Sequence, residues 1–412
     1  MEKISINNFA GIKEMDFEFK SINILIGPQG VGKSITVKLL YFFKSFFNET
    51  RRNIIAEDSE SELDNKQIEK FITFFPKETW PQDNFRIVYS LDSIEITVEK
   101  IKDQLKIYYS ENLKVAIRGI KKIYSEEKKK VTVENSTRLL GYEKELNSSV
   151  DQFLKTEIGS TAAYNQFFIP AGRSFFANIQ KSIFSFFNDN RSLDPFLIEF
   201  GTYYESFKAI AVSEAFDRIA DKRFDEITAQ ILNGVYQREK DGDYLMHSDS
   251  RKVNLINASS GQQETLPLII ILKVLSTLPD DGGTIYIEEP EAHLFPITQK
   301  AIVQLLARTF NSNANNFQII VTTHSPYILS SFNNLLEAGR LSELKPEQSK
   351  NIAKIVPQAE QLSPGLLTAY SLNNGGKEDL IDKESKLITQ TALDSVSNEI
   401  AIEFGKLLDI EF

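Results

Sequence analysis

Short, mainly apolar runs that end in glycine or in polar residues recur along the chain, and they predict buried strands. These runs are Ile22–Ile26, Phe167–Ile169, Thr284–Ile287 and Gln318–Val321. Apolar residues at helical spacing follow the first run over Ile35–Phe47. Buried strands combined with helices favour the α/β fold class.

Residues 86 to 119 have a different pattern, in which apolar and polar positions alternate between turn residues. The alternation predicts an antiparallel meander with strands over Arg86–Leu91, Ser93–Glu99, Gln104–Tyr109 and Leu113–Ile117. We therefore expect an antiparallel β subdomain beside the α/β core.

Later stretches add helices and one hairpin. Helical patterns cover Ser136–Lys155 and residues 175–233, and Asp243–Ile256 resembles a hairpin. No internal repeat or low-complexity linker stands out, so we expect one discontinuous domain over residues 1–412. Its core is predicted to comprise residues 1–118, 160–174 and 243–412, with insertions over residues 119–159 and 175–242.

Composition limits the choice of environment and partners. The chain has 412 residues, no cysteine and a formal net charge of −10. Disulfides and thiolate metal sites are therefore excluded. No apolar run approaches the roughly 18 residues that span a bilayer, and the alternating start Met1–Ile6 lacks the shape of a signal peptide. We expect a cytoplasmic protein with no membrane contact.

The acidic balance argues against a protein coated with nucleic acid, because phosphate binding needs concentrated Lys and Arg. A local basic patch and a solvated hairpin or helix end both stay open for the lysine cluster Lys121, Lys122, Lys128, Lys129 and Lys130. Several of the 30 phenylalanines lie at helical spacing, which suits helix packing or, less commonly, stacking on bases. They are Phe42, Phe43, Phe46, Phe47, Phe71, Phe74 and Phe75.

The segment Gly27–Ser34 fits the pattern G-x-x-x-x-G-K-[ST] at every position and lies between a predicted strand and a predicted helix. Glycines let backbone N–H groups turn toward phosphate oxygens, and the positive end of the next helix favours the same anion. Lys33 is expected to reach the β- and γ-phosphates of ATP, and the Ser34 hydroxyl to bind Mg²⁺. An ordinary glycine-rich turn is the alternative. The predicted cofactor-binding residues are Gly27, Pro28, Gln29, Gly30, Val31, Gly32, Lys33, Ser34 and Ile35.

A second motif, Ala258–Glu264, opens the apolar helical stretch Thr265–Leu278. Small residues at a helix start expose N–H groups and hydroxyls, which suits a γ-phosphate. A plain helix cap is the alternative.

A third motif, Thr284–Leu294, ends an apolar strand in the adjacent carboxylates of Glu288 and Glu289. Successive strand residues point to opposite sides, so one carboxylate can face Mg²⁺ and the other a water molecule. Ser34 is a predicted metal ligand, and the residues alone leave open which of the two glutamates faces the metal. A solvated acidic loop is the alternative.

A fourth motif, Gln318–Pro326, is another apolar strand, and it ends in polar residues that include His324. An isolated histidine is more often structural. A histidine at the carboxyl end of a strand, near other such ends, is better placed for chemistry.

Together, the four motifs resemble those of the ABC-type ATPase heads in the SMC/RecF/OLD group. On this resemblance, Walker A is Gly27–Ser34, the signature is Ala258–Gln262, Walker B is Tyr286–Glu289 and the switch histidine is His324. The strings Glu-Glu-Pro-Glu-Ala-His-Leu and Thr-Thr-His-Ser-Pro are most like the OLD-like branch.

The loop Phe168–Arg173 also resembles a loop of that branch near the Q-loop position, and Arg173 is carried over as a cofactor-binding residue. The resemblance implies an ABC-type P-loop ATPase head with an antiparallel β subdomain and a helical insertion. Its cofactors would be ATP and Mg²⁺.

The resemblance also implies a mechanism in which two copies bind ATP between them, head to tail, as a dimer or within a higher oligomer. Lys33 and Ser34 of one copy would hold the phosphates and Mg²⁺. The signature of the other copy would close over the γ-phosphate, through Ser259, Ser260, Gly261 and Gln262. The catalytic residues would be Lys33, Glu289, which deprotonates the attacking water, and His324, which senses the γ-phosphate.

Two departures from the family pattern change the expectation. Glu288 stands where the family usually has the Asp that binds Mg²⁺, so the resemblance implies Ser34 and Glu288 as the metal ligands. Because the side chain of Glu is longer, the metal is expected to shift and hydrolysis to be slow or partner-dependent. OLD nucleases carry a Toprim domain after the head. Here the 88 residues after His324 (412 minus 324) hold no Asp-x-Asp motif, so the chain is not expected to cut DNA by itself.

Free-standing heads of this kind resemble the ATPase subunits of bacterial anti-phage systems such as PARIS and Septu. The leading hypothesis is an oligomeric sensor and scaffold that controls a separately encoded effector, such as a nuclease or toxin, with DNA or a phage protein as the trigger. The alternative is a DNA repair ATPase that binds DNA as a RecF-like clamp. The ATPase subunit of a membrane transporter is a third, weaker reading.

Overall fold

The computed structural model describes residues 1–55, 60–81, 84–130, 138–178, 193–213, 221–277, 282–312, 316–374, 376–389 and 401–407. The chain divides into two compact units. The first comprises Met1–Phe19, Ser34–Phe168 and Asp281–Tyr286, and the second comprises Lys20–Lys33, Ile169–Asp280 and Ile287–Phe412. None of the helices in the described ranges has both the length and the apolar character that crossing a bilayer requires.

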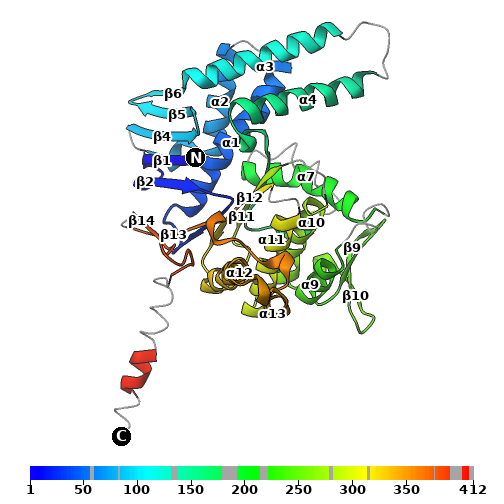
Figure 1. The fold of residues 1–412 in the computed structure, drawn as a ribbon. Helices are drawn as coiled ribbons and strands as arrows, with labels where there is room; N and C mark the ends of the chain where they lie inside the picture. The colour runs from blue at the N-terminus through cyan, green and yellow to red at the C-terminus, as the bar shows by residue number, and fades with distance from the viewer. Residues whose placement is uncertain are drawn as a thin grey trace. The chain divides into compact units, whose positions relative to one another are not determined.

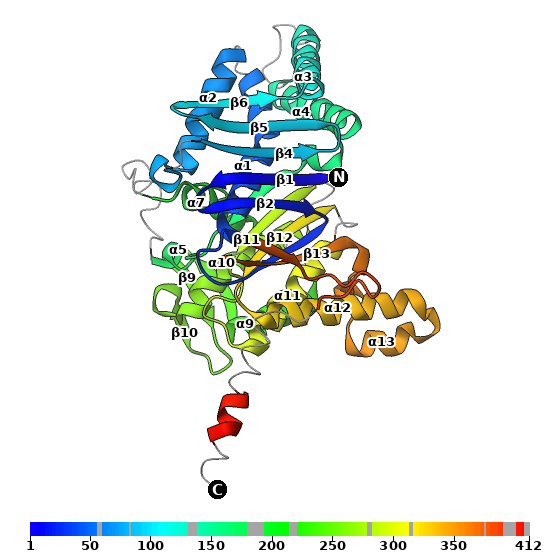
Figure 2. The same ribbon diagram turned by 90° about the vertical axis from the view of Figure 1, so that its left-hand side faces the viewer.

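The first unit is built on an antiparallel sheet with the strand order β2-β1-β4-β5-β6 (Figure 2). Its strands are β1 (Glu2–Phe9), β2 (Ile12–Phe19), β4 (Asn84–Leu91), β5 (Ile94–Ile101) and β6 (Gln104–Tyr109). Alternation of buried and exposed positions along β4 confirms the predicted pattern. The antiparallel β subdomain is therefore confirmed for three of the four predicted strands.

The fourth predicted strand, Leu113–Ile117, is wrong, because these residues belong to helix α3 (Glu111–Lys130). The buried apolar residues of α3 are Leu113, Ala116, Ile117 and Ile120, spaced by three and four as in an amphipathic helix. Helix α3 crosses the predicted core boundary at residue 118. It pairs with α4 (Arg138–Glu157), which matches the predicted helix (Figure 1).

Aromatic side chains fill the core of the first unit between the sheet and the helices α1 (Lys33–Ile55) and α2 (Glu60–Phe74). Phe43 of α1 stacks on Tyr89 of β4 with ring centroids 5.5 Å apart. Phe71 of α2 contacts Phe9 and Phe42 at 5.7 and 5.4 Å. The packing interpretation of these phenylalanines is confirmed, since such ring pairs stabilise a core.

Another sheet has the strand order β14-β13-β3-β12-β11-β7, and its strands β3, β12, β13 and β14 lie in the second unit. Its strands are β3 (Ile22–Ile26), β7 (Asn165–Ile169), β11 (Gly283–Glu288), β12 (Phe317–Thr323), β13 (Leu367–Asn373) and β14 (Gly376–Asp379). Strand β3 runs parallel to both β12 and β13. The carboxyl ends of β3 and β12 therefore meet at one edge, where α/β proteins place ligands.

Helices of the second unit include α5 (Phe175–Asn178), α7 (Pro195–Ala211), α9 (Lys222–Leu232), α10 (Ser260–Leu275), α11 (Pro296–Ser312), α12 (Pro326–Leu344) and α13 (Ser349–Ile355). A small sheet has the order β10-β9-β8, with β8 (Val235–Glu239), β9 (Gly242–Met246) and β10 (Lys252–Asn254). The predicted hairpin is confirmed by β9 and β10, and β8 adds a strand that the sequence did not predict. The described parts of residues 175–233 are mainly helical, and residues 179–192 and 214–220 lie outside them.

Candidate functional site

The predicted phosphate loop connects β3 to α1, so the strand–loop–helix context is confirmed. Gly27, Gly30 and Gly32 have positive φ angles of 153°, 77° and 98°, which glycine adopts without a side-chain clash. At Gly27 the need for glycine is also steric, because a Cβ would lie 2.2 Å from the Leu372 carbonyl oxygen. Pro28, Gln29 and Gly30 are exposed, whereas Val31 is buried.

Lys33 folds back over its own loop. Its Nζ donates to the carbonyl oxygens of Gly27 at 2.7 Å and Pro28 at 2.6 Å. Burial lowers the pKa of Lys33, and the nearby charges of Glu289 and Glu291 partly offset that effect. Ser34 is exposed and Ile35 half-buried in the first turn of α1.

His324 lies between Lys33 and Glu289. Its Nδ1 is 3.5 Å from Lys33 Nζ, and its Nε2 is 3.2 Å from a Glu289 carboxylate oxygen. The lysine can only donate, so Nδ1 accepts and Nε2–H donates to Glu289, which assigns the neutral Nε2–H tautomer from the hydrogen-bond partners. The structure thus brings the three predicted catalytic residues into one contact chain.

The alternation argument expected the carboxylates of Glu288 and Glu289 to continue one strand, but they do not. Strand β11 ends at Glu288, and Glu289 has a φ of +46°, in the left-handed region. Its N–H donates to the Thr322 carbonyl at 2.9 Å. This turn, rather than strand alternation, presents Glu289 to His324.

Glu291 is a residue whose role the sequence analysis missed. One of its carboxylate oxygens accepts from the Thr323 hydroxyl at 2.7 Å and from the His324 N–H at 2.6 Å. It therefore fixes the turn that carries His324. Its proximity to Glu288 and Glu289 in the motif was the available sequence signal.

Arg173 is fully buried and holds the ends of several segments together. Its guanidinium donates to the carbonyl oxygens of Pro170 at 2.8 Å, Glu288 at 2.7 Å and Glu289 at 3.1 Å. Burial lowers its pKa, and Glu264 is the main opposing charge. These contacts place Arg173 as a positioning residue behind the Walker B turn, whereas its predicted cofactor contact stays a prediction.

Glu264 of α10 is the partner of Arg173, and the sequence analysis did not single it out. Its carboxylate accepts from the N–H groups of Arg173 at 2.9 Å and Ser174 at 2.8 Å. Its main-chain carbonyl accepts from Arg173 Nε at 2.9 Å. The pair therefore connects the predicted signature helix to the end of β11.

The hydrogen bonding of the Glu288 carboxylate bears on the prediction that Glu288 binds a metal ion. One of its carboxylate oxygens is buried without a hydrogen-bond partner, and the other accepts weakly from the Ala171 N–H at 3.4 Å. A buried carboxylate with a free oxygen suits Mg²⁺. No cluster of three or more acidic, histidine or cysteine residues suited to a metal ion exists among the described residues. The predicted site needs none, because Ser34 and nucleotide phosphates supply the other ligands in P-loop proteins.

The predicted signature begins α10. Ser259 and Gln262 form a capping box, in which the Ser259 hydroxyl accepts from the Gln262 N–H at 3.4 Å and the Gln262 side chain accepts from the Ser259 N–H at 3.0 Å. Ser260 is exposed, and its side chain has no partner among the described residues. A Cβ at Gly261 would lie 2.9 Å from the His293 carbonyl oxygen, so the signature packs against the loop after β11.

Residues 22–330 match the family model described as "AAA domain, putative AbiEii toxin, Type IV TA system". The chain belongs to this family of AAA-domain ATPases. All four motifs of the candidate site lie within the matched residues.

The AAA domain also resembles individual proteins. The chain is 31% identical over 96 residues to the "Retron Vc95 probable ATPase" of Vibrio cholerae serotype O1 biovar El Tor, a match that covers 21% of this chain and 18% of that protein.

Solved structures with similar folds include the SMC head domain from Thermotoga maritima, with 12% identity, a TM-score of 0.37 and coverage of 92% of this chain and 97% of that one. The recombination mediator RecF gives 11% identity, a TM-score of 0.33 and coverage of 92% and 97%.

Proposed function

We propose that this chain binds and hydrolyses ATP in pockets that a second copy completes. The observation that carries the proposal is the contact chain from Lys33 through His324 to Glu289, which joins the phosphate loop to a carboxylate held by a histidine. A lysine, a histidine and a glutamate at neighbouring strand ends suit phosphoryl transfer to water.

The residues would divide the work as follows. ATP supplies the scissile phosphoanhydride and Mg²⁺ neutralises charge on its phosphates. Lys33 would leave the carbonyls of Gly27 and Pro28 to donate to a phosphate oxygen. Glu289, about a third exposed and held by His324 Nε2–H, is placed to take a proton from a water molecule. Glu288 and Ser34 would hold the metal.

The first test replaces Glu289 by Gln, which keeps the shape and removes the base. ATP turnover should fall about 100-fold or more while ATP binding persists, because general base catalysis contributes roughly that factor. Glu347→Gln, at an exposed position of the same unit, should leave turnover unchanged. Unchanged turnover in the Glu289→Gln variant would exclude Glu289 as the base.

The second test asks whether one pocket uses two chains. Lys33→Ala and Ser260→Arg chains should each be inactive alone. Mixed and re-equilibrated, they should recover about a quarter of the wild-type rate, because half of the random dimers then hold one intact pocket of two. Thr202→Arg, an exposed change on α7, should keep full activity. A monomer that hydrolyses ATP at the wild-type rate would contradict the composite pocket.

We propose further that ATP binding or turnover controls a separately encoded effector in anti-phage defence. The toxin-related description of the family and the partial similarity to a retron ATPase support this role. The chain should co-purify with the product of a neighbouring gene, and Lys33→Ala should abolish protection against phage. Equal protection by wild type and Lys33→Ala would overturn it.

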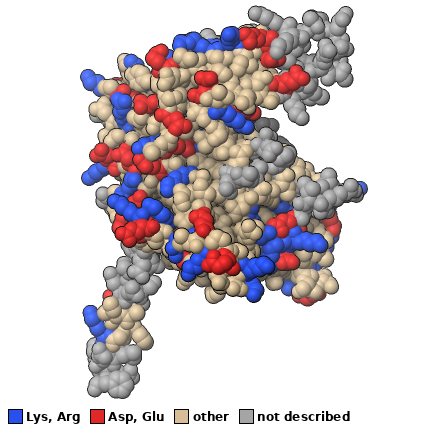
Figure 3. Space-filling model, in the orientation of Figure 1, with Lys and Arg blue, Asp and Glu red and all other residues tan. Residues whose placement is uncertain are grey.

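A DNA clamp is the competing role. On the face drawn in Figure 3, the Lys and Arg side chains of the described residues are interspersed with Asp and Glu. Strong, salt-sensitive, ATP-dependent binding to duplex DNA would nevertheless favour the clamp, since phosphate contacts make affinity fall steeply with salt.

A further inference from the structure

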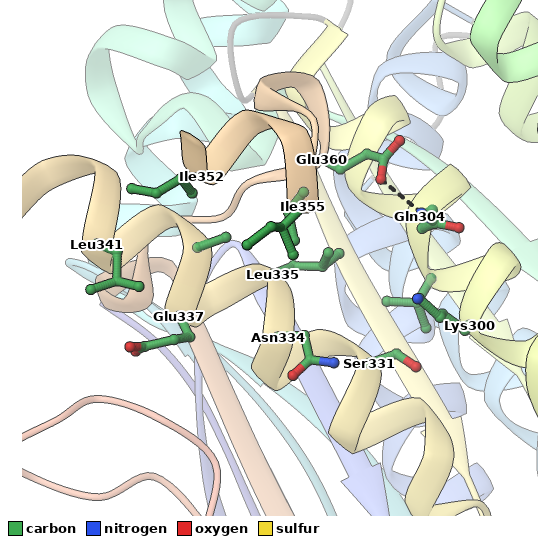
Figure 4. A pocket seen from close by; sticks show the side chains of 13 residues that line it. Lys300, Gln304, Ser331, Asn334, Leu335, Glu337, Leu341, Ile352, Ile355 and Glu360 are labelled. Atoms are coloured by element: carbon green, nitrogen blue, oxygen red, sulfur yellow. Dashed lines mark hydrogen bonds between the residues drawn. The ribbon is translucent and has the colours of Figure 1, made fainter. Parts of the chain in front are cut away.

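An apolar groove lies in the second unit between α11, α12 and α13, away from the residues discussed above. Its volume is about 330 Å³. Figure 4 shows Leu335 and Leu341 of α12 and Ile352 and Ile355 of α13 around it. Ile355 is 84% exposed at its edge, which is unusual for a large apolar side chain. We call this feature the α11–α13 groove.

The charged side chains that line the groove differ in whether they form ion pairs. The two acidic side chains that line it are already paired, Glu337 with Arg340 and Glu360 with Arg308. Lys300 of α11, the lysine that lines the groove, is exposed and forms no ion pair among the described residues. The groove therefore offers an apolar floor beside one exposed, unpaired lysine.

A complementary segment exists in the same chain. Residues 401–407 are helical, and Ile402, Phe404 and Leu407 are 58%, 61% and 64% exposed. Residues 401–412 carry Glu403, Asp409 and Glu411 against one basic residue, Lys406. We call residues 401–412 the acidic tail.

The acidic tail is tethered next to the groove. Asn333 of α12 forms two hydrogen bonds with the main chain of Ile388, at 2.8 and 3.1 Å. The next residue of α12, Asn334, lines the groove. The 11 residues from 390 to 400 can span at most roughly 36–40 Å when extended. The acidic tail can therefore reach the α11–α13 groove of the same chain.

We propose that the acidic tail docks in the α11–α13 groove of its own chain, with Phe404 and Leu407 against the apolar floor. Burial of two large apolar side chains is favourable, and the tether makes the effective concentration of the tail high. Lys300 would face the tail carboxylates.

The chain has no cysteine, so a disulfide trap can be placed without background. Full-length protein with Ile355→Cys and Leu407→Cys should form an intrachain disulfide under mild oxidation, seen as a faster monomer band on a non-reducing gel. The matched control pairs Leu407→Cys with Val235→Cys, which is 57% exposed on β8. The groove pair should close about tenfold faster or more, because a docked tail holds the sulfurs at bonding distance.

One more variant and one change of salt concentration make the result decisive. Phe404→Asp in the groove pair should reduce the rate to that of the control pair, and high salt should also lower it. Equal rates for the groove and control pairs would overturn the proposal. A second experiment mixes chains that carry Ile355→Cys alone with chains that carry Leu407→Cys alone. A disulfide-linked dimer from this mixture, together with no intrachain band from the chain that carries both cysteines, would also overturn the proposal and assign the groove to a second copy.

Discussion

Two buried ion pairs, one in each unit, show why charge burial alone does not identify a functional site. In the first unit, Lys44 lies 3.0 Å from Glu2, and Tyr89 donates to the same carboxylate at 2.7 Å. In the second unit, Arg173 lies 3.6 Å from Glu264. All four charged side chains are at most 5% exposed, so both pairs carry a large desolvation cost.

The difference lies in what each pair holds. The Lys44 pair joins side chains of α1, β1 and β4. Arg173 instead donates to the main-chain carbonyls of Glu288 and Glu289, so its planar fork sets the position of both Walker B residues. On the proposed mechanism, a buried charge becomes relevant to catalysis when it fixes the backbone that carries the proposed catalytic residues.

The largest expected effect separates the two pairs directly. Arg173→Met and Lys44→Met should each lower the free energy of unfolding by about 3–5 kcal/mol, because each leaves a buried carboxylate unpaired. Arg173→Met should also lower ATP turnover by about 100-fold, since small displacements of catalytic groups have effects of that size. Lys44→Met should keep turnover within about twofold for the folded protein.

Urea unfolding and turnover at saturating ATP measure the two effects separately. Assays at a temperature where both variants stay folded remove the trivial explanation of lost structure. Equal losses of turnover in the two variants would contradict the distinction between the pairs.

The same contrast explains what the sequence could predict. Glu289 and His324 directly follow strands and Lys33 opens a helix, all within recognisable motifs, so local pattern could place them together. Glu264 binds residues about 90 positions away, and no local pattern reports such a contact. The available sequence signal for Glu264 was its position as a charged residue directly before the apolar stretch Thr265–Leu278.

The error at Leu113–Ile117 has another cause. A short segment with alternating character also fits a helix, and only the longer spacing through Ile120 decides between them. Strand β8 was missed because most of its residues are exposed, so burial gives it little apolar pattern.

A smaller effect should follow from keeping the charge and changing its geometry. Arg173→Lys preserves the ion pair with Glu264 but cannot reach three carbonyls at once, so turnover should fall about tenfold. Lys44→Arg, the reciprocal change in the first unit, should leave turnover nearly unchanged. A wild-type rate in the Arg173→Lys variant would show that charge, not the fork, matters.

The length of the side chain of Glu288, the proposed metal ligand, gives a third comparison between the units. Glu288→Asp should raise turnover roughly two- to fivefold if the longer arm displaces the metal. Glu2→Asp shortens the buried carboxylate of the first unit and should give no gain. The rates are compared across a magnesium titration, and a loss of activity in Glu288→Asp would show that the site is built around glutamate.

The smallest expected effect is the pH dependence of stability. Burial raises the pKa of Glu264, but Arg173 and the Arg173 and Ser174 amides outweigh it, so the pKa is lowered overall. A carboxyl group with a lowered pKa stabilises the fold at pH values above its ordinary pKa of 4.5. This stabilisation is lost as the pH falls below that value.

For Lys44, at the alkaline end of the pH scale, stability should also rise with pH. Burial lowers its pKa below 10.5, with Glu2 partly offsetting this, so the unfolded chain binds more protons and stability should rise as the pH approaches 10.5. Urea unfolding at about pH 4, 7 and 9.5 checks both trends. Glu264→Gln should weaken the pH dependence of the free energy of unfolding only on the acid side. Lys44→Met should weaken it only on the alkaline side. A variant that flattens both would mean that the two pairs do not titrate independently.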